Sequence, residues 1–189
     1  YNRLRMEGAG VVSVGAYGTV YYNLNCEKAP FDNVLVRKAF NLAVDRTALI
    51  NDVVQVECEP AYSAVSPGYS VNGEVAQAIY ANFVPGYDFD YEGPAYDPEL
   101  SRQLLAEAGY PNGEGFPAVT LSYYSDESVK KVVEALAEML QTNLNITVNI
   151  VNQEWSVYYP DVQAGNYEIC AMGWSGDYVH PMTFLSLNV

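Results

Sequence analysis

The feature that most constrains the fold is an alternation of strand and helix patterns between residues 119 and 174. Residues 119–124 alternate as a strand, and the stretch that begins at Ser125 or Asp126 and runs to about Gln141 carries apolar residues at helical spacing. Residues 146–151 alternate strictly, residues 155–164 form the next helix pattern, and residues 167–172 form a third strand pattern. This β-α-β-α-β order predicts a parallel α/β sheet with right-handed crossovers.

The first part of the chain adds further strands and helices to this unit. Residues 11–14 are apolar and residues 19–24 are β-branched and aromatic, so both stretches are typical of strands. Asp32 or Asn33 is suited to be the N-cap of a helix, and Asp45 is suited to be the N-cap of a second helix over residues 46–54.

Between these elements lies a stretch without periodicity. Residues 59–97 are rich in proline and glycine and read as loop, with a helical turn at residues 73–80. A helix follows, for which Asp97 is the expected N-cap, Pro98 the first residue and Gly109 the end. Its expected buried face comprises Leu100, Leu104, Leu105 and Ala108.

The charge of the chain argues against one class of partner. Nine basic residues against 23 acidic ones give a net charge of −14, and the basic residues are scattered. A phosphate-binding surface needs a cluster of lysine and arginine, so no nucleic-acid partner is expected. Length and apolar content fit one folded domain with a real core.

The residues that usually carry catalysis or hold metals are mostly missing. The three cysteines, Cys26, Cys58 and Cys170, match no zinc pattern; Cys170 is expected to be buried, and a bond between Cys26 and Cys58 stays open. The single histidine, His180, is expected at the surface or as a cap. No phosphate loop or nucleophile elbow is present, and no carboxylate pair is placed across a cleft, so neither a catalytic residue, a metal nor a cofactor is predicted.

Residues 154–178 carry the pattern of a binding surface. Trp155 opens a helix, an apolar strand runs into Trp174, and Asp177 follows the end of that strand. Ligands bind at the carboxyl ends of strands in α/β sheets, where a carboxylate can accept hydrogen bonds from an ammonium and aromatic rings can bury the attached apolar body. The alternative for Asp177 is that it caps a helix near residues 180–187, and the residues alone leave both readings open.

Several segments, taken in order, resemble one known family. The chain looks like the extracytoplasmic solute-binding proteins of peptide and nickel ABC transporters, the oligopeptide/dipeptide-binding group. The resemblance covers nearly the whole chain, and its most specific part is the Ala-Pro-Phe-Asp-x-Val-x-Val-Arg run. It rests on residues 21–25, 29–46, 60–63, 96–99, 104–111, 154–155 and 174–178.

The resemblance implies a fold, a role and a location. Such proteins have two α/β lobes that close on ligand like a trap and hand it to a membrane permease. Residues 1–189 resemble a single lobe, the carboxy-terminal one, of a type II periplasmic-binding-protein-like fold, with a mixed sheet flanked by helices. The amino-terminal lobe, which carries the export signal, is expected to be missing. The implied protein is a monomeric, non-enzymatic peptide receptor, either periplasmic or lipid-anchored at the outer face of the cell membrane.

The resemblance also implies site residues. Asp177 matches the aspartate that pairs with the α-amino group of the peptide, and Trp155 matches a tryptophan that lines side-chain pockets. Further lining positions match Tyr159, Trp174, Ser175 and Tyr178. Some oligopeptide binders have arginines where this chain has Val162 and Ala171, so the carboxylate end of a peptide lacks that counterpart here.

Two alternatives differ in ligand or in class. The same family type could bind another solute, such as a metal chelate or an oligosaccharide, because Trp155 and Trp174 could stack on sugar rings. A carboxylate-based hydrolase is the enzyme alternative and is the least favoured. Because the opposite lobe would supply half of the contacts, the isolated lobe is expected to bind free peptides weakly or not at all.

Overall fold

The structure is a computed structural model that describes residues 17–61, 70–71, 74–75, 96–178, 180 and 182–186. The predicted strand at residues 11–14 lies outside these ranges. The chain divides into two compact units, which we call the main unit (residues 22–60 and 94–172) and the second unit (residues 1–21, 61–93 and 173–189). Each unit is described by itself.

The central element is a four-stranded sheet with the strand order β1-β6-β4-β5. The strands are β1 (Gly18–Leu24), β4 (Val119–Tyr124), β5 (Val148–Gln153) and β6 (Ile169–Ser175). Strand β4 pairs in parallel with both β5 and β6, which confirms the predicted β-α-β-α-β arrangement. Strand β1 runs antiparallel to β6, because Asn25 after its end donates to the Glu168 carbonyl while Gly18 at its start lies against Ser175. The sheet is therefore mixed, as the resemblance implied.

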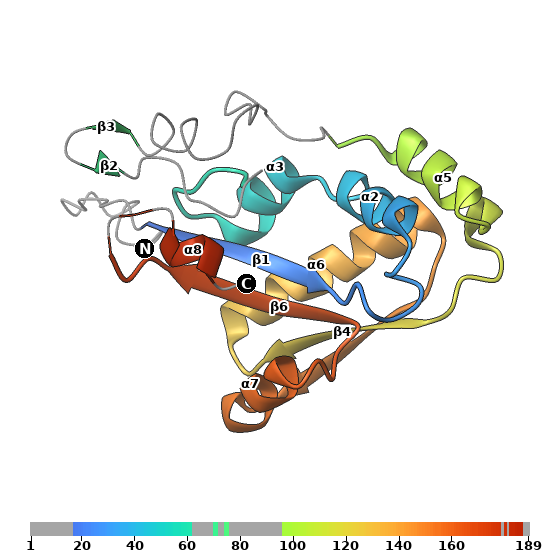
Figure 1. The fold of residues 1–189 in the computed structure, drawn as a ribbon. Helices are drawn as coiled ribbons and strands as arrows, with labels where there is room; N and C mark the ends of the chain where they lie inside the picture. Colours follow the sequence, from blue (N-terminus) through green and yellow to red (C-terminus); the bar gives the residue numbers. More distant parts are fainter. Residues whose placement is uncertain are drawn as a thin grey trace. The chain divides into compact units, whose positions relative to one another are not determined.

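Two helices of the main unit cover opposite faces of β4 (Figure 1). Helix α6 (Glu127–Leu144) packs its buried side chains Val133, Leu136 and Leu140 on the face of β4 that carries Val119 and Leu121. Helix α7 (Trp155–Gln163) covers the other face. None of the helices in the described ranges is long and apolar enough to cross a membrane.

Helix α6 begins where the sequence predicted, and Asp126 is its N-cap. The Asp126 side chain accepts hydrogen bonds from the backbone N–H groups of Ser128 and Val129, at 2.8 and 3.1 Å, and also from the Ser128 hydroxyl. These hydrogen bonds hold the pKa of the Asp126 carboxyl below its usual value. The helix ends at Leu144, three residues beyond the predicted end at Gln141, where Asn145 adopts a left-handed conformation.

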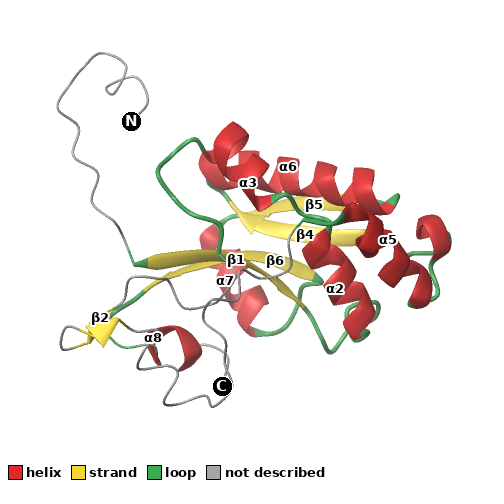
Figure 2. Ribbon diagram, turned by 90° about the horizontal axis from the view of Figure 1, so that it is seen from above, coloured by secondary structure: helices red, strands yellow, loops and turns green. Residues whose placement is uncertain are grey.

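Helices α2 (Val34–Leu42) and α5 (Pro98–Glu107) lie side by side in the main unit (Figure 2). Their caps are Asn33 and Asp97, so Asn33 rather than Asp32 is the cap of α2. Leu100 was expected in the buried face of α5, but this prediction is wrong, since its side chain is 41% exposed. The close contact is made instead by Ser101, whose hydroxyl donates to the Ala39 carbonyl at 2.6 Å, because a small side chain lets the two backbones approach.

The second predicted helix, over residues 46–54, is present, and its last two thirds form a π-helix. Asp45 accepts a hydrogen bond from Ala48 and opens α3 (Arg46–Ala48), which continues as the π-helix η1 (Leu49–Val54). The helical turn expected at residues 73–80 is wrong where the structure describes it, because β2 (Ser70–Val71) and β3 (Glu74–Val75) pair as antiparallel strands. The sequence between them, Asn-Gly, is a strong hairpin signal that the prediction missed.

The connection from α5 to β4 contains a tightly constrained glycine. Gly113, the last residue of the short helix η2 (Pro111–Gly113), has a φ of +77°, and a Cβ at this position would lie 2.3 Å from the Asn145 carbonyl oxygen. Gly115 has nearly the same φ, +76°, but nothing lies within 4 Å of its would-be Cβ. The first glycine is thus required by conformation and by space, whereas the second is required by conformation alone.

All three cysteines are free. Cys170 is buried in β6, as predicted, and burial raises the pKa of its thiol to about 11. Cys26 and Cys58 are exposed and do not form the disulfide that the sequence left open.

Candidate ligand-binding surface

The first candidate surface is an aromatic cluster in the main unit, formed by Tyr124, Trp155, Tyr158 and Tyr159. The ring of Trp155 stacks on Tyr159 with centroids 5.2 Å apart and meets Tyr124 edge-on, also at 5.2 Å. Trp155 is 50% exposed and Tyr159 is 38% exposed. The cluster therefore presents an indole and a phenol ring to solvent, in geometries that aromatic pairs prefer.

The cluster follows from the spacing of residues on α7. Glu154 is the N-cap and Trp155 is the first helical residue, directly after β5 ends at Gln153. Residues three and four positions apart lie on one side of a helix, so Tyr158 and Tyr159 are neighbours of Trp155. Tyr124, the last residue of β4, closes the cluster from the sheet.

Tyr158 anchors this helix to the sheet. Its side chain is fully buried, and its hydroxyl lies 2.6 Å from the Ala171 carbonyl oxygen and 3.2 Å from the Ser122 carbonyl oxygen. Those carbonyls belong to β6 and β4, so one phenol spans two strands. Burial raises the pKa of the Tyr158 phenol. The position of Trp155 on the surface thus depends on a buried contact one helical turn away.

The second candidate surface, described by itself, is the end of β6 in the second unit. Trp174 is partly buried, and its indole N–H is buried without an acceptor among the described residues. Ser175 is exposed, and Gly18 of β1 lies so close that its would-be Cβ would be 3.2 Å from the Ser175 hydroxyl oxygen. A hydrogen bond from the Gly176 N–H to the Tyr17 carbonyl continues this pairing beyond the strand.

Asp177 lies in the segment that follows the strand. Its backbone N–H donates to the Thr183 hydroxyl at 3.0 Å, which holds the segment against α8 (Met182–Leu185). Its side chain is exposed and has no hydrogen bond or ion pair with a described residue. Tyr178, next in the chain, is 51% exposed.

The alternative reading of Asp177 as a helix cap is wrong. Helix α8 begins five residues later, and the Met182 N–H is accepted by the Nδ1 atom of His180 at 3.2 Å. The expectation that His180 is a surface or capping residue is confirmed by this bond. The Asp177 carboxylate is left available for another group.

The predicted site residues fall into two sets. Trp155 and Tyr159 are together in the main unit, where they stack on each other. Trp174, Ser175, Asp177 and Tyr178 follow one another in the second unit. Sequence reasoning missed Tyr124 and Tyr158, although the spacing of Tyr158 from Trp155 was a usable signal. Ala171, where some oligopeptide binders have arginine, is buried in β6, so its side chain faces the core.

The sequence of the chain is similar to those of known proteins. Residues 3–189 match the model of the middle region of the bacterial extracellular solute-binding proteins, family 5. The periplasmic oligopeptide-binding protein OppA of Haemophilus influenzae is 36% identical over 97% of this chain and 33% of its own length. Heme-binding protein A of the same species is 34% identical over 88% of this chain and 28% of its own length.

A solved structure shares the fold. The crystal structure of Haemophilus influenzae OppA in complex with RPPGFSPFR has a TM-score of 0.80 and 33% identity, over all of this chain and 36% of that one. The chain thus spans about a third of the length of the relatives that it matches. The fold is that of a fragment of a type II periplasmic binding protein.

Proposed function

The chain belongs to the bacterial extracellular solute-binding proteins of family 5, and we propose that it contributes the ligand-contacting surface of a peptide receptor for an ABC transporter. In this proposal residues 1–189 form one lobe of a monomeric, non-catalytic binding protein. The receptor works outside the cytoplasm, either in the periplasm or lipid-anchored at the outer face of the cell membrane, and delivers peptides to a membrane permease.

The observation that carries the proposal is the state of Asp177. A carboxylate that is exposed and unpaired among the described residues can accept charge-assisted hydrogen bonds from the α-amino group of a peptide. Trp174, Ser175 and Tyr178 lie beside it in the chain and supply aromatic and hydroxyl groups for the first residues of the ligand.

The aromatic cluster supports the same class of ligand. Trp155 and Tyr159 offer exposed ring faces that can bury apolar side chains without demanding one particular shape. The relatives include an oligopeptide-binding protein and a heme-binding protein, so proteins similar to this chain are named for different ligands. The peptide is favoured here because the carboxylate gives a partner for an amine, which a sugar lacks.

An amide NMR titration tests the proposal on the 189-residue chain, since it detects weak binding. Tri-alanine with a free amine should shift the resonances of residues 174–178, and N-acetylated tri-alanine should not. Asp177→Asn should weaken binding of the free-amine peptide by about tenfold or more, because a hydrogen bond to a charged group contributes about 1.5–3 kcal/mol.

The alternatives make different predictions in the same titration. If Asp177→Asn bound tri-alanine as well as the parent chain does, the assignment of Asp177 to the amine would be wrong. An oligosaccharide such as maltotriose that shifted the Trp155 and Trp174 resonances equally in both chains would favour the sugar alternative. A metal chelate such as a nickel–histidine complex tests the remaining solute class.

A further inference from the structure

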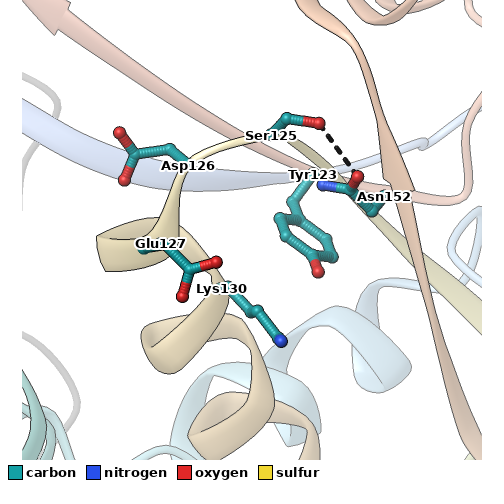
Figure 3. Close-up of a pocket in the computed structure, with 6 residues that line it drawn as sticks. All are labelled: Tyr123, Ser125, Asp126, Glu127, Lys130 and Asn152. Carbon is teal, nitrogen blue, oxygen red and sulfur yellow. Dashed lines mark hydrogen bonds between the residues drawn. The ribbon is translucent and has the colours of Figure 1, made fainter.

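The main unit also contains a cavity that is lined by residues other than those of the aromatic cluster. It has a volume of about 520 Å³ and is lined by Tyr123, Ser125, Asp126, Glu127, Lys130 and Asn152. These residues come from the carboxyl ends of β4 and β5 and from the first turns of α6, as Figure 3 shows. The volume falls within the range of about 300–1,000 Å³ that is typical of small-molecule sites.

One wall of this cavity is the side chain of a mostly buried tyrosine. Tyr123 is only 5% exposed, and its hydroxyl has no hydrogen-bond partner among the described residues. The hydroxyl oxygen itself is not among the buried unpaired side-chain atoms of the described residues, so it is open to the cavity and can donate to or accept from a bound group. In Figure 3 the Tyr123 ring reaches into the space between α6 and Asn152, so its hydroxyl is offered to the cavity.

Two more donors line the same space. The Ser125 hydroxyl donates to the Oδ1 atom of Asn152 at 2.9 Å, which orients the Asn152 amide and leaves its Nδ2 group without a partner among the described residues. Among the described residues, the Lys130 ammonium pairs only with Glu134 on its own helix, at 4.0 Å, and both side chains are about half exposed. An exposed pair at that distance contributes little, so the ammonium can turn to a ligand.

Negative charge lines the rest of the cavity. Glu127 precedes Lys130 by three residues on α6, so the two side chains lie on one side of the helix, and no ion pair joins them in the described structure. Asp126 is held by its capping hydrogen bonds but remains ionised. A ligand with only a negative charge would be repelled by the two carboxylates, which outnumber the one ammonium. A ligand with only a positive charge would leave the three hydrogen-bond donors without an acceptor.

We propose that this cavity binds a zwitterionic amino acid. The ligand carboxylate accepts hydrogen bonds from the Tyr123 hydroxyl, the Asn152 amide and the Lys130 ammonium, and the ligand ammonium faces Glu127. The residues of this site are not those of the aromatic cluster and do not include Asp177, and the proposal does not rest on the proposed function.

The test is an amide NMR titration of the 189-residue chain with L-alanine, propionate and ethylamine. L-Alanine should shift the resonances of residues 123–130 and 152, and propionate and ethylamine, which each carry one of its two charges, should bind at least tenfold more weakly. Equal binding of L-alanine and propionate would overturn the zwitterion assignment, and no binding of L-alanine would overturn the site.

Conservative variants separate the site from a general surface effect. Tyr123→Phe keeps the ring and removes the hydroxyl, and Lys130→Met keeps the aliphatic chain and removes the charge; each should weaken L-alanine binding by about tenfold. Lys131→Met is the matched control, because Lys131 is exposed on the same helix and does not line the cavity, and its affinity should stay unchanged. If Tyr123→Phe and Lys130→Met both bind L-alanine as tightly as the control does, the proposal fails. Asp177→Asn should leave L-alanine binding unchanged, whatever its effect on tri-alanine binding.

Discussion

Tyr158→Phe should destabilise the chain measurably while leaving the exposed rings in place. The substitution removes the hydroxyl that bonds to the Ala171 carbonyl at 2.6 Å and lies 3.2 Å from the Ser122 carbonyl, but it keeps the ring that packs near Tyr124 and Trp155. Loss of a buried hydrogen bond that leaves an acceptor unpaired costs about 1–2 kcal/mol. For a chain of this size, that loss corresponds to a fall in melting temperature of about 2–8 °C.

Chemical denaturation followed by circular dichroism measures this loss. Tyr159→Phe is the matched control, because Tyr159 is the adjacent residue on α7, is 38% exposed, and has no hydrogen bond to its hydroxyl among the described residues. The control should change the free energy of unfolding by less than about 0.5 kcal/mol. If the two variants were equally stable, the argument that Tyr158 anchors α7 would be refuted.

The same variant should change the response to alkaline pH. The folded chain raises the pKa of Tyr158, and that of the partly buried Tyr22, above the unfolded value of about 10, chiefly through burial. The unfolded chain therefore loses these protons first, and the stability that they contribute is complete below pH 10 and falls as the pH rises above it. Each tyrosine can account for up to about 1.4 kcal/mol per pH unit. Tyr158→Phe should thus lose less stability between pH 10 and pH 11 than the parent chain, and an unchanged slope would contradict this.

Two further predictions concern a glycine pair and the thiols. Gly113→Ala should destabilise the chain by more than about 3 kcal/mol, because it adds a collision with backbone to an unfavourable φ, whereas Gly115→Ala should cost only about 1–2 kcal/mol; equal losses in thermal denaturation would show that space at Gly113 is not limiting. A thiol reagent at neutral pH should label Cys26 and Cys58 in the native chain, and Cys170 only after unfolding, because Cys170 is buried and the pKa of its thiol is raised to about 11. Rapid native labelling of Cys170, read by mass spectrometry, would contradict its burial.

The sequence by itself determined the elements whose stability is local. Asp97 and Asp45 cap the helices that they were expected to cap, and α6 begins at the predicted place. An N-cap bond joins a side chain to a backbone N–H only two or three residues away, so it can be predicted from local sequence. The parallel arrangement of β4, β5 and β6 was also predictable, since a strand-helix-strand segment almost always forms a right-handed crossover between parallel strands. The residue pattern also pointed to Trp155 and Asp177, and the family resemblance added their expected roles, which stay predictions.

Only the tertiary structure decided which side chains meet across elements. Ser101 rather than Leu100 faces α2, because the rotation of α5 depends on how closely its partner helix approaches. The ring of Tyr124 contacts that of Trp155, and the Tyr158 hydroxyl bonds to the carbonyls of Ser122 and Ala171. The two residues in each of these contacts are 13 to 36 positions apart in the chain. The cavity beside Tyr123 exists because β4, β5 and α6 end or begin at one edge of the sheet. Such contacts are set by packing between segments distant in the chain, and no local pattern encodes the distance between them.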